Sequence, residues 1–337
     1  MAIADAQPLI DAMHAPESVL ALDGEGWTAL IAMARAEQII GSLAHRIADL
    51  PIPAAAARIM ADARASADQG RTAALWEAEM ARRALAPLGL PVLLLKGTAY
   101  VAAGLGAGVG RSIGDLDILV PRGSLDAAEA ALLAAGWEWV KPDAYDDAYY
   151  RRWMHELPPL IHGTRDRMID VHHTILPLTA RITPDAGAMI ADRIELGNGL
   201  SVLMREDMVL HAVAHLFADG DLAGGVRNLW DIHRLLDEFA GDGFEARLAA
   251  RARLHGLEAS LARALRLRDV VYGEGAAAGG MDALYVRRLL ARDGWGRPTR
   301  PVTQAAFYIR GHWLRMPPLM LARHLWTKWR KGGPGPG

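Results

Sequence analysis

The stretch "LLLKGTAYVAAGLGAGVGRSIGDLDILV", residues 93–120, decides the fold that this sequence predicts. Two short apolar runs, residues 91–95 around its start and residues 115–120 at its end, are bounded by Pro and Gly. This favours buried strands over helices. Between them, "TAYVAAGL" is typical of a helix and "GAGVGRSIG" of a flexible loop. The second strand carries Asp115 and Asp117 one residue apart, and because strand side chains alternate, both project from one face.

Two ionised carboxylates held side by side repel each other, so a strand that pairs them usually presents them to a cation. Hard oxygen ligands suit Mg²⁺ or Mn²⁺. On this pair alone, an alternative stays open, in which the two aspartates cap the following turn or are solvated at the strand end.

A third acid comes from "MIDVHH", residues 168–173. Strand alternation puts Asp170 and His172 on one face and His173 on the other. If this strand lies beside 115–120, three carboxylates meet, and around two divalent ions they form the apparatus for in-line phosphoryl or nucleotidyl transfer. We expect His172 beside Asp170, where it contacts phosphate or tunes the carboxylate; the alternative is a histidine hydrogen-bonded within the sheet.

Strands and helices alternate between about 91 and 204, with a strand expected at 136–140 and two strands in 156–175 joined by a polar turn at 163–166. Helical periodicity dominates before and after this region. The sequence therefore predicts an α+β fold, a small mixed sheet with flanking helices between two helical regions. The expected divisions are a helical N-terminal region 1–90, a core 91–204, a helical C-terminal domain 205–331 and a disordered tail 332–337.

Composition narrows the class of protein. The 337 residues are 52% hydrophobic and 23% charged with a formal net charge of −2, so a dedicated nucleic-acid binder is not expected. The absence of cysteine excludes disulfides, thiolate catalysis and cysteine zinc sites. The opening residues lack the pattern of a signal peptide, and no apolar run approaches the length of a membrane span, so we expect a cytoplasmic protein.

The order "LLLKG", apolar helix, "RSIGDLDILV" and "IDVHH" resembles the nucleotidyltransferase fold of the DNA polymerase beta superfamily, and within it the bacterial group of uncharacterised nucleotidyltransferases. The resemblance covers about 91–240 and implies that Asp115, Asp117 and Asp170 are the three metal carboxylates.

In the wider superfamily a Gly-Ser or Gly-Gly pair precedes the aspartates and cradles the nucleotide phosphates through backbone N–H groups at a helix start. This sequence has "KGT" at that place, so the resemblance implies that Gly97 and Thr98 hold phosphates and that Lys96 adds positive charge.

The resemblance also implies that a helical C-terminal domain forms the other wall of the cleft, and "GGVRNLWDIHRLLDEF", residues 224–239, is the best candidate. Arg227 and Asp231 face the substrate there or form an i,i+4 ion pair. Arg111, in the loop before Asp115, clamps a triphosphate or is a solvated loop arginine. His211 and His215 lack the glutamate of an H-E-x-x-H site, so we interpret them as partly buried helix histidines.

These observations predict an Mg²⁺- or Mn²⁺-dependent nucleotidyltransferase. It would move an NMP, with AMP from ATP expected, to an acceptor hydroxyl on a small molecule, sugar or peptide. The alternatives are a non-catalytic nucleotide-sensing or partner-binding module on the same scaffold and a metal-dependent phosphotransferase. The Trp- and Arg-rich stretch 307–331 is a candidate for weak contact with a membrane or an acidic partner, or is an amphipathic helix packed on the domain.

Overall fold

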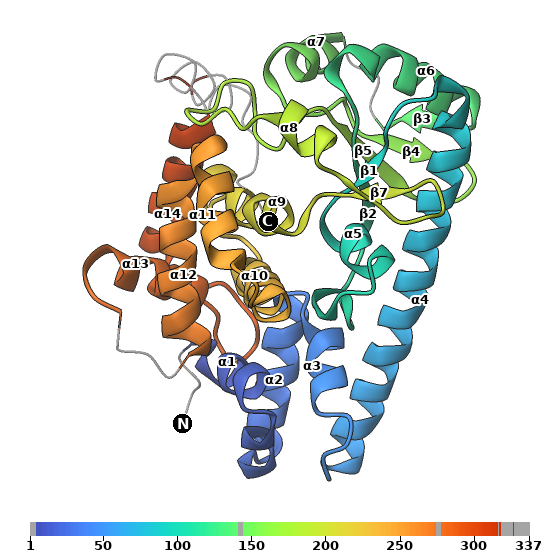
Figure 1. Cartoon of the computed structure of the whole chain (residues 1–337). Helices are drawn as coiled ribbons and strands as arrows, with labels where there is room; N and C mark the ends of the chain where they lie inside the picture. The colour runs from blue at the N-terminus through green and yellow to red at the C-terminus, as the bar shows by residue number, and fades with distance from the viewer. Residues whose placement is uncertain (1–4, 141–143, 274–277, 316, 318–325, 327–337) are drawn as a thin grey trace.

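The computed structural model describes residues 5–140, 144–273, 278–315, 317 and 326. A mixed sheet lies in one half of the molecule, with helices from the N-terminal third beside and below it and C-terminal helices across from it (Figure 1). The predicted α+β fold is confirmed. The expected tail 332–337 and most of 307–331 lie outside the described residues.

The sheet has seven strands in the order β3-β4-β5-β2-β1-β7-β6. The strands are β1 (Leu93–Leu94), β2 (Asp115–Leu119), β3 (Trp137–Trp139), β4 (Leu160–His162), β5 (Met168–His172), β6 (Ile194–Glu195) and β7 (Ser201–Val202). The pairs β2–β5 and β1–β7 are parallel and the others antiparallel, so the sheet is mixed as expected.

The register between β2 and β5 sets the geometry of the site. Asp117 lies directly opposite Asp170, and Asp115 lies opposite Met168. Since paired residues of neighbouring strands project from the same face, this register brings the acidic positions of the two strands together. Leu116, Ile118 and Ile169 are buried in the core.

Helices of the N-terminal third are α1 (Gln7–His14), α2 (Gly24–Ala36), α3 (Ile40–Arg46) and α4 (Ala54–Leu85), with a 3₁₀ turn η1 (Pro16–Ala21). Pro53 directly precedes α4, at the break that the sequence predicts. With 32 residues, α4 is about 48 Å long and runs beside the sheet (Figure 1).

The core region contains α5 (Lys96–Ala102), α6 (Leu125–Ala134), α7 (Ala144–Trp153) and α8 (Ala186–Ala191), with 3₁₀ turns η2 (Ala86–Leu88), η3 (Gly106–Gly108) and η4 (Arg122–Ser124). The helices α7 and α8 and the strands β6 and β7 are not among the elements that sequence periodicity predicts. Each of these strands is only two residues long, too short for an alternating pattern to show.

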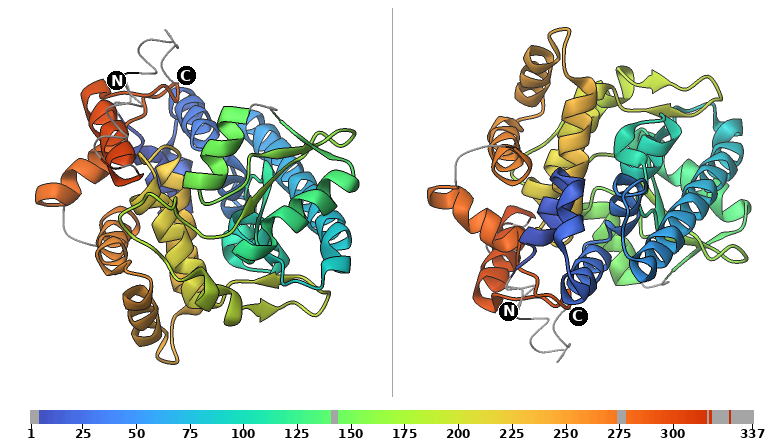
Figure 2. Two further views of the ribbon diagram at one scale, coloured as in Figure 1. Left: turned by 90° about the horizontal axis from the view of Figure 1, so that it is seen from above. Right: turned by 90° about the horizontal axis from the view of Figure 1, so that it is seen from below.

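The C-terminal part is helical, as predicted. It contains α9 (Arg205–Val213), a π-helical turn η5 (Ala214–Asp219), α10 (Gly225–Phe239), α11 (Phe244–Leu254), α12 (Glu258–Tyr272), α13 (Gly280–Leu289) and α14 (Pro301–Arg315). Figure 2 shows α9 and α10 in the middle of the molecule, between the other C-terminal helices and the half that holds the sheet. Within the described part of the chain, every helix is too short or too polar to cross a bilayer.

The N-terminal helices hold both halves of the site in place. Glu37, after α2, accepts a hydrogen bond from the backbone N–H of Val226 at 3.3 Å and so caps the start of α10. On the other side, the hydroxyl of Ser42 in α3 donates to the backbone carbonyl of Val109 at 3.0 Å. The N-terminal region therefore contacts both the loop before β2 and the helix that faces it.

Candidate functional site

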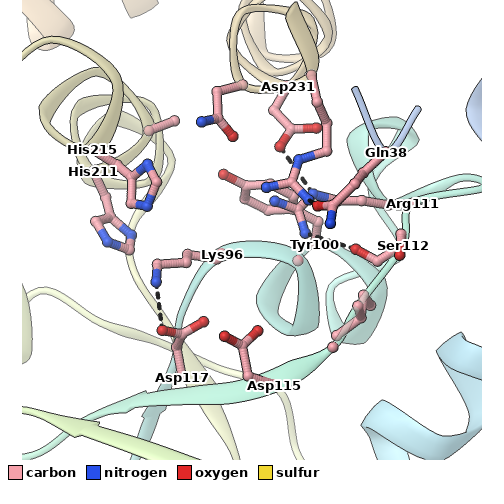
Figure 3. Close-up of a pocket in the computed structure, with 16 residues that line it drawn as sticks. Gln38, Lys96, Tyr100, Arg111, Ser112, Asp115, Asp117, His211, His215 and Asp231 are labelled. Carbon is pink, nitrogen blue, oxygen red and sulfur yellow. Dashed lines mark hydrogen bonds and ion pairs between the residues drawn. The ribbon is translucent and has the colours of Figure 1, made fainter. Parts of the chain in front are cut away.

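A cavity of about 280 Å³ lies between the start of β2, the helix α5 and the helices α9 and α10. Its lining comes from the N-terminal, core and C-terminal parts of the chain (Figure 3). The lining residues are Gln38, Lys96, Gly97, Tyr100, Arg111, Ser112, Ile113, Gly114, Asp115, Asp117, His211, Ala212, His215, Arg227, Asn228 and Asp231.

The three predicted metal carboxylates meet at one edge of this cavity. One oxygen from each of Asp115, Asp117 and Asp170 lies within 4.8 Å of the others. Asp115 is exposed, Asp170 is partly buried and Asp117 is 3% exposed. The alternation of side chains along β2 and the parallel pairing of β2 with β5 therefore bring the three carboxylates together, as the sequence predicts.

The pKa values of Asp170 and Asp117 are shifted in opposite directions. Burial, followed by the nearby carboxylates of Glu156 and Asp117, raises the pKa of Asp170 to about 7. Burial acts on Asp117 in the same direction, but the ammonium of Lys96 and the ring of His172 outweigh it and lower the pKa of Asp117. Crowded carboxylates of this kind suit a divalent cation, since its charge removes their mutual repulsion. The donor set, three carboxylates without nitrogen or sulfur, fits Mg²⁺ or Mn²⁺.

Lys96 contacts the trio directly. Its Nζ donates to Oδ1 of Asp117 at 2.6 Å (Figure 3). Lys96 is the first residue of α5 and has a φ of +47°, in the left-handed region that a non-glycine residue seldom adopts. This backbone turn between β1 and α5 places the ammonium over β2, where it neutralises Asp117. The sequence predicts the positive charge at the site but not this partner.

The other two residues of "KGT" lie in different surroundings. Gly97 lines the cavity. Thr98 is 1% exposed and is not among the lining residues. The structure therefore brings Lys96 and Gly97 to the cavity and leaves Thr98 in the interior of the protein.

Arg111 is not a solvated loop residue, which was the alternative that the sequence left open. The side chain is 8% exposed, and its Nε donates to Oδ2 of Asp231 at 2.9 Å. Burial lowers the pKa of Arg111, but the carboxylate of Asp231 outweighs this and raises it, so the guanidinium stays charged. This ion pair joins the loop before β2 to α10 across the cavity.

Arg227 does not form the i,i+4 ion pair with Asp231 that was one of the two interpretations. Its Nη1 donates instead to Oε1 of Gln38 at 2.8 Å, and Asp231 pairs with Arg111. The Nε of Arg227 is buried and has no hydrogen-bond partner within the described part of the chain. Two guanidinium groups, Arg111 and Arg227, thus line the cavity that the aspartates border.

His172 contacts Asp117 rather than Asp170, the neighbour that we expected. Its Nε2 lies 3.0 Å from Oδ1 of Asp117, and the ring is 2% exposed. His173, on the opposite face as predicted, lies 3.2 Å from the backbone carbonyl of Met154. His172 therefore joins the site by fixing Asp117.

Several lining residues are not among those that the sequence predicts for the site. His211 and His215 are interpreted above as structural, yet both line the cavity, and burial lowers the pKa of His215 to about 3, which keeps it neutral. Their i,i+4 spacing was a signal that both share one helix face. Gln38, Tyr100 and Asn228 also line the cavity, and no local pattern marks them.

Comparison with known proteins places the chain in a family. No curated protein matches the chain. A family model described as "Uncharacterised nucleotidyltransferase" matches residues 23–273, which is most of the chain and includes the complete cavity lining. The predicted family is thereby confirmed at the level of nucleotidyltransferases, while the wider superfamily stays a prediction. The match, together with the three converging aspartates beside the cavity, shows that this chain belongs to the family of uncharacterised nucleotidyltransferases.

Proposed function

We propose that this protein is a cytoplasmic Mg²⁺-dependent nucleotidyltransferase. It would transfer an NMP, AMP from ATP in the expected case, to a hydroxyl of a small molecule, sugar or peptide. The observation that carries the proposal is the meeting of Asp115, Asp117 and Asp170 at the edge of a cavity that two arginines also line.

The charges of the cavity favour a triphosphate. Arg111 and Arg227 present guanidinium groups, whose N–H donors match phosphate oxygens. The unpartnered Nε of Arg227 is a buried donor that a phosphate oxygen would satisfy. Gly97 follows Lys96 in the first turn of α5, where N–H groups lack partners within the helix.

Asp115, Asp117 and Asp170 would hold the metal ions, which when bound lower the pKa of the acceptor hydroxyl and stabilise charge on the leaving pyrophosphate. The acceptor oxygen forms the new bond to the α-phosphorus, and the bond from that phosphorus to the β-phosphate oxygen breaks. Asp170, the third carboxylate of the trio, would accept the hydroxyl proton or position the group that accepts it. His172 and Lys96 hold Asp117 in position.

The test follows label from ATP in the presence of Mg²⁺ and a filtered extract of cell metabolites and peptides. Label from α-³²P-ATP should appear in a new product, and label from γ-³²P-ATP should appear only in pyrophosphate. Transfer of the γ-label would instead identify a phosphotransferase. ATP binding without transfer of either label would identify the nucleotide-sensing module.

Variants connect the activity to the site. Asp115→Asn and Asp117→Asn should each abolish α-label transfer, because each removes a metal ligand. The matched control is Asp166→Asn in the turn between β4 and β5, where φ is +53° and asparagine is tolerated. Undiminished turnover in both site variants would refute the proposal.

A further inference from the structure

A second cluster of ligand atoms lies next to the aspartates. One ligand atom from each of His155, Glu156 and His172 lies within 4.8 Å of the others. The backbone fixes this arrangement, since Glu156 forms an antiparallel bridge with His172 and the N–H of His173 donates to the carbonyl of His155 at 2.9 Å. Directly opposed residues of an antiparallel pair project to the same face, so the carboxylate of Glu156 lies beside the ring of His172.

Two distances in this cluster match the spacing of ligands around an ion. Nδ1 of His172 lies 3.5 Å and Nε2 of His155 lies 3.6 Å from Oε2 of Glu156. Both distances exceed the range of about 2.7–3.2 Å for N–H···O hydrogen bonds. Two ligand atoms about 2.1 Å from one Zn²⁺, at a tetrahedral angle, lie about 3.4 Å apart.

The two nitrogens of the His172 ring have different surroundings. Nε2 faces Asp117, a carboxylate that also accepts from Lys96, so Nε2 is the nitrogen that donates. Nδ1 lies on the other side of the ring, 3.5 Å from Oε2 of Glu156. The ring is 2% exposed, and Nδ1 is buried without a hydrogen-bond partner in the described part of the chain. A metal ion between this nitrogen and Glu156 would give the buried nitrogen a partner.

We propose that His155, Glu156 and His172 form a second metal site, which binds a transition-metal dication of the Zn²⁺ type. Two imidazole nitrogens and one carboxylate are a common ligand set for such ions. Mg²⁺ prefers oxygen ligands, so the two neighbouring sites would select different metals. This site does not depend on the proposed transferase activity.

The site would also act on the aspartates. A metal-bound histidine usually donates its other N–H to a carboxylate, which fixes the ring and its tautomer. His172 has this relation to Asp117. The metal would therefore position Asp117 through the ring of His172, and His172 is a positioning residue for the aspartate trio.

In the experiment, a chelator first removes metal from the full chain. The chain is then titrated with Co²⁺, and visible absorption is recorded. In a parallel titration with Zn²⁺, the bound metal is measured after desalting. The intact protein should bind one equivalent of Zn²⁺ that excess Mg²⁺ does not displace. Glu156→Gln and His155→Gln should each weaken Zn²⁺ binding at least about 100-fold, since loss of even an outer partner costs about 10–100-fold.

Two controls separate the sites. Asp115→Asn should keep the Zn²⁺ equivalent, because Asp115 belongs to the other cluster. His173→Gln should keep it as well, because His173 is adjacent in sequence but lies near the carbonyl of Met154. Circular dichroism and melting curves without metal verify that each variant folds, and Zn²⁺ should raise the melting temperature of the intact chain but not of Glu156→Gln.

The proposal is overturned if the folded, intact chain binds no Zn²⁺ equivalent, or if Glu156→Gln and His155→Gln bind it as tightly as the intact chain. Loss of the equivalent in Asp115→Asn with retention in Glu156→Gln would assign the ion to the aspartate trio and also overturn it. The Co²⁺ and Zn²⁺ titrations measure bound metal and not transferase activity. They therefore test the second site even if the transferase assay finds no activity.

Discussion

Gly97 and Arg111 pack so closely that a Cβ atom on Gly97 would lie 2.0 Å from Nη1 of Arg111. The guanidinium occupies the space that any side chain at position 97 would need. Because Arg111 is also held by Asp231, at 2.9 Å, it has little freedom to move aside. The glycine at the start of α5 and the arginine before β2 are therefore one structural unit.

Gly97→Ala should displace Arg111 and weaken its ion pair with Asp231. We expect a loss of about 1–3 kcal/mol in the free energy of unfolding, which is the usual effect of forcing extra atoms into a packed site. Urea unfolding measures the loss, and titration with Mg²⁺-ATP measures the accompanying fall in affinity.

The control for this substitution is Gly114→Ala. Gly114 lines the same cavity, and a Cβ there meets nothing within 4 Å. This variant should stay within about 0.5 kcal/mol of the original chain. Equal effects of the two alanines would contradict the close-packing argument.

The buried ion pair of Arg111 and Asp231 should show strong coupling. Arg111→Met or Asp231→Leu alone leaves a buried charge without its partner and should cost about 3–5 kcal/mol. The double variant should cost much less than the sum of the two, since it leaves no unpaired charge. A double-mutant cycle from urea unfolding gives the coupling energy.

An ion pair with an exposed arginine gives the comparison for this cycle. Arg266 lies 2.6 Å from Asp282, but its side chain is 53% exposed. Arg266→Ala should change stability by no more than about 1 kcal/mol. If the effects of Arg111→Met and Asp231→Leu are additive, the buried pair is not a coupled unit.

Lys96→Met should increase the affinity for Mg²⁺ in the absence of nucleotide. The ammonium lies 2.6 Å from Oδ1 of Asp117 and repels a cation that approaches the same carboxylate. We expect binding about tenfold tighter by calorimetry, together with weaker ATP binding. Lys96→Arg, which retains the charge, should bind Mg²⁺ like the original chain, and weaker Mg²⁺ binding by Lys96→Met would contradict the prediction.

The free energy of unfolding should fall in acid, because Asp207 in α9 becomes protonated. Burial raises the pKa of this carboxyl, but hydrogen bonds from His255 and Arg251 outweigh burial and lower it below its ordinary value. Because the folded pKa is below the unfolded one, the contribution is present above the unfolded pKa of about 3.9 and is lost as the pH falls below it.

Asp207→Asn tests this contribution. The variant should lose about 3–5 kcal/mol at neutral pH, and its difference from the original chain should narrow as the pH falls below about 3.9. Asp192→Asn is the control, since Asp192 contacts the same arginine at 2.7 Å but is 51% exposed. A difference that does not vary with pH would show that the charge of Asp207 is not the cause.

Local patterns were enough to predict the strands β1 to β5 and the meeting of the three aspartates. The alternation in 115–120 and in 168–173 is a property of neighbouring residues, so the shared face of Asp115 and Asp117 follows directly from the sequence. The antiparallel hairpin of β4 and β5 also follows, because the polar turn at 163–166 marks it.

Contacts between distant segments could not be predicted in this way. Arg111 and Asp231 are 120 positions apart, and the four-residue spacing of Arg227 and Asp231 suggested a different pair. Lys96 bonds to Asp117 because a left-handed turn directs it over β2, and a non-glycine residue gives no sign of such a turn. His172 contacts Asp117 because β5 lies beside β2 and because Nε2 of the ring faces Asp117. Neither fact can be read from the local pattern of residues.

The cavity wall takes Gln38 from the first part of the chain, Arg111 from the middle and Arg227 from the last part. On a ribosome, the aspartates of β2 and β5 are therefore synthesised well before the last arginine that faces them. A nascent chain that ends near residue 204 would have the three acids but only part of the cationic side, so the cavity is complete only after α10 has been made and packed.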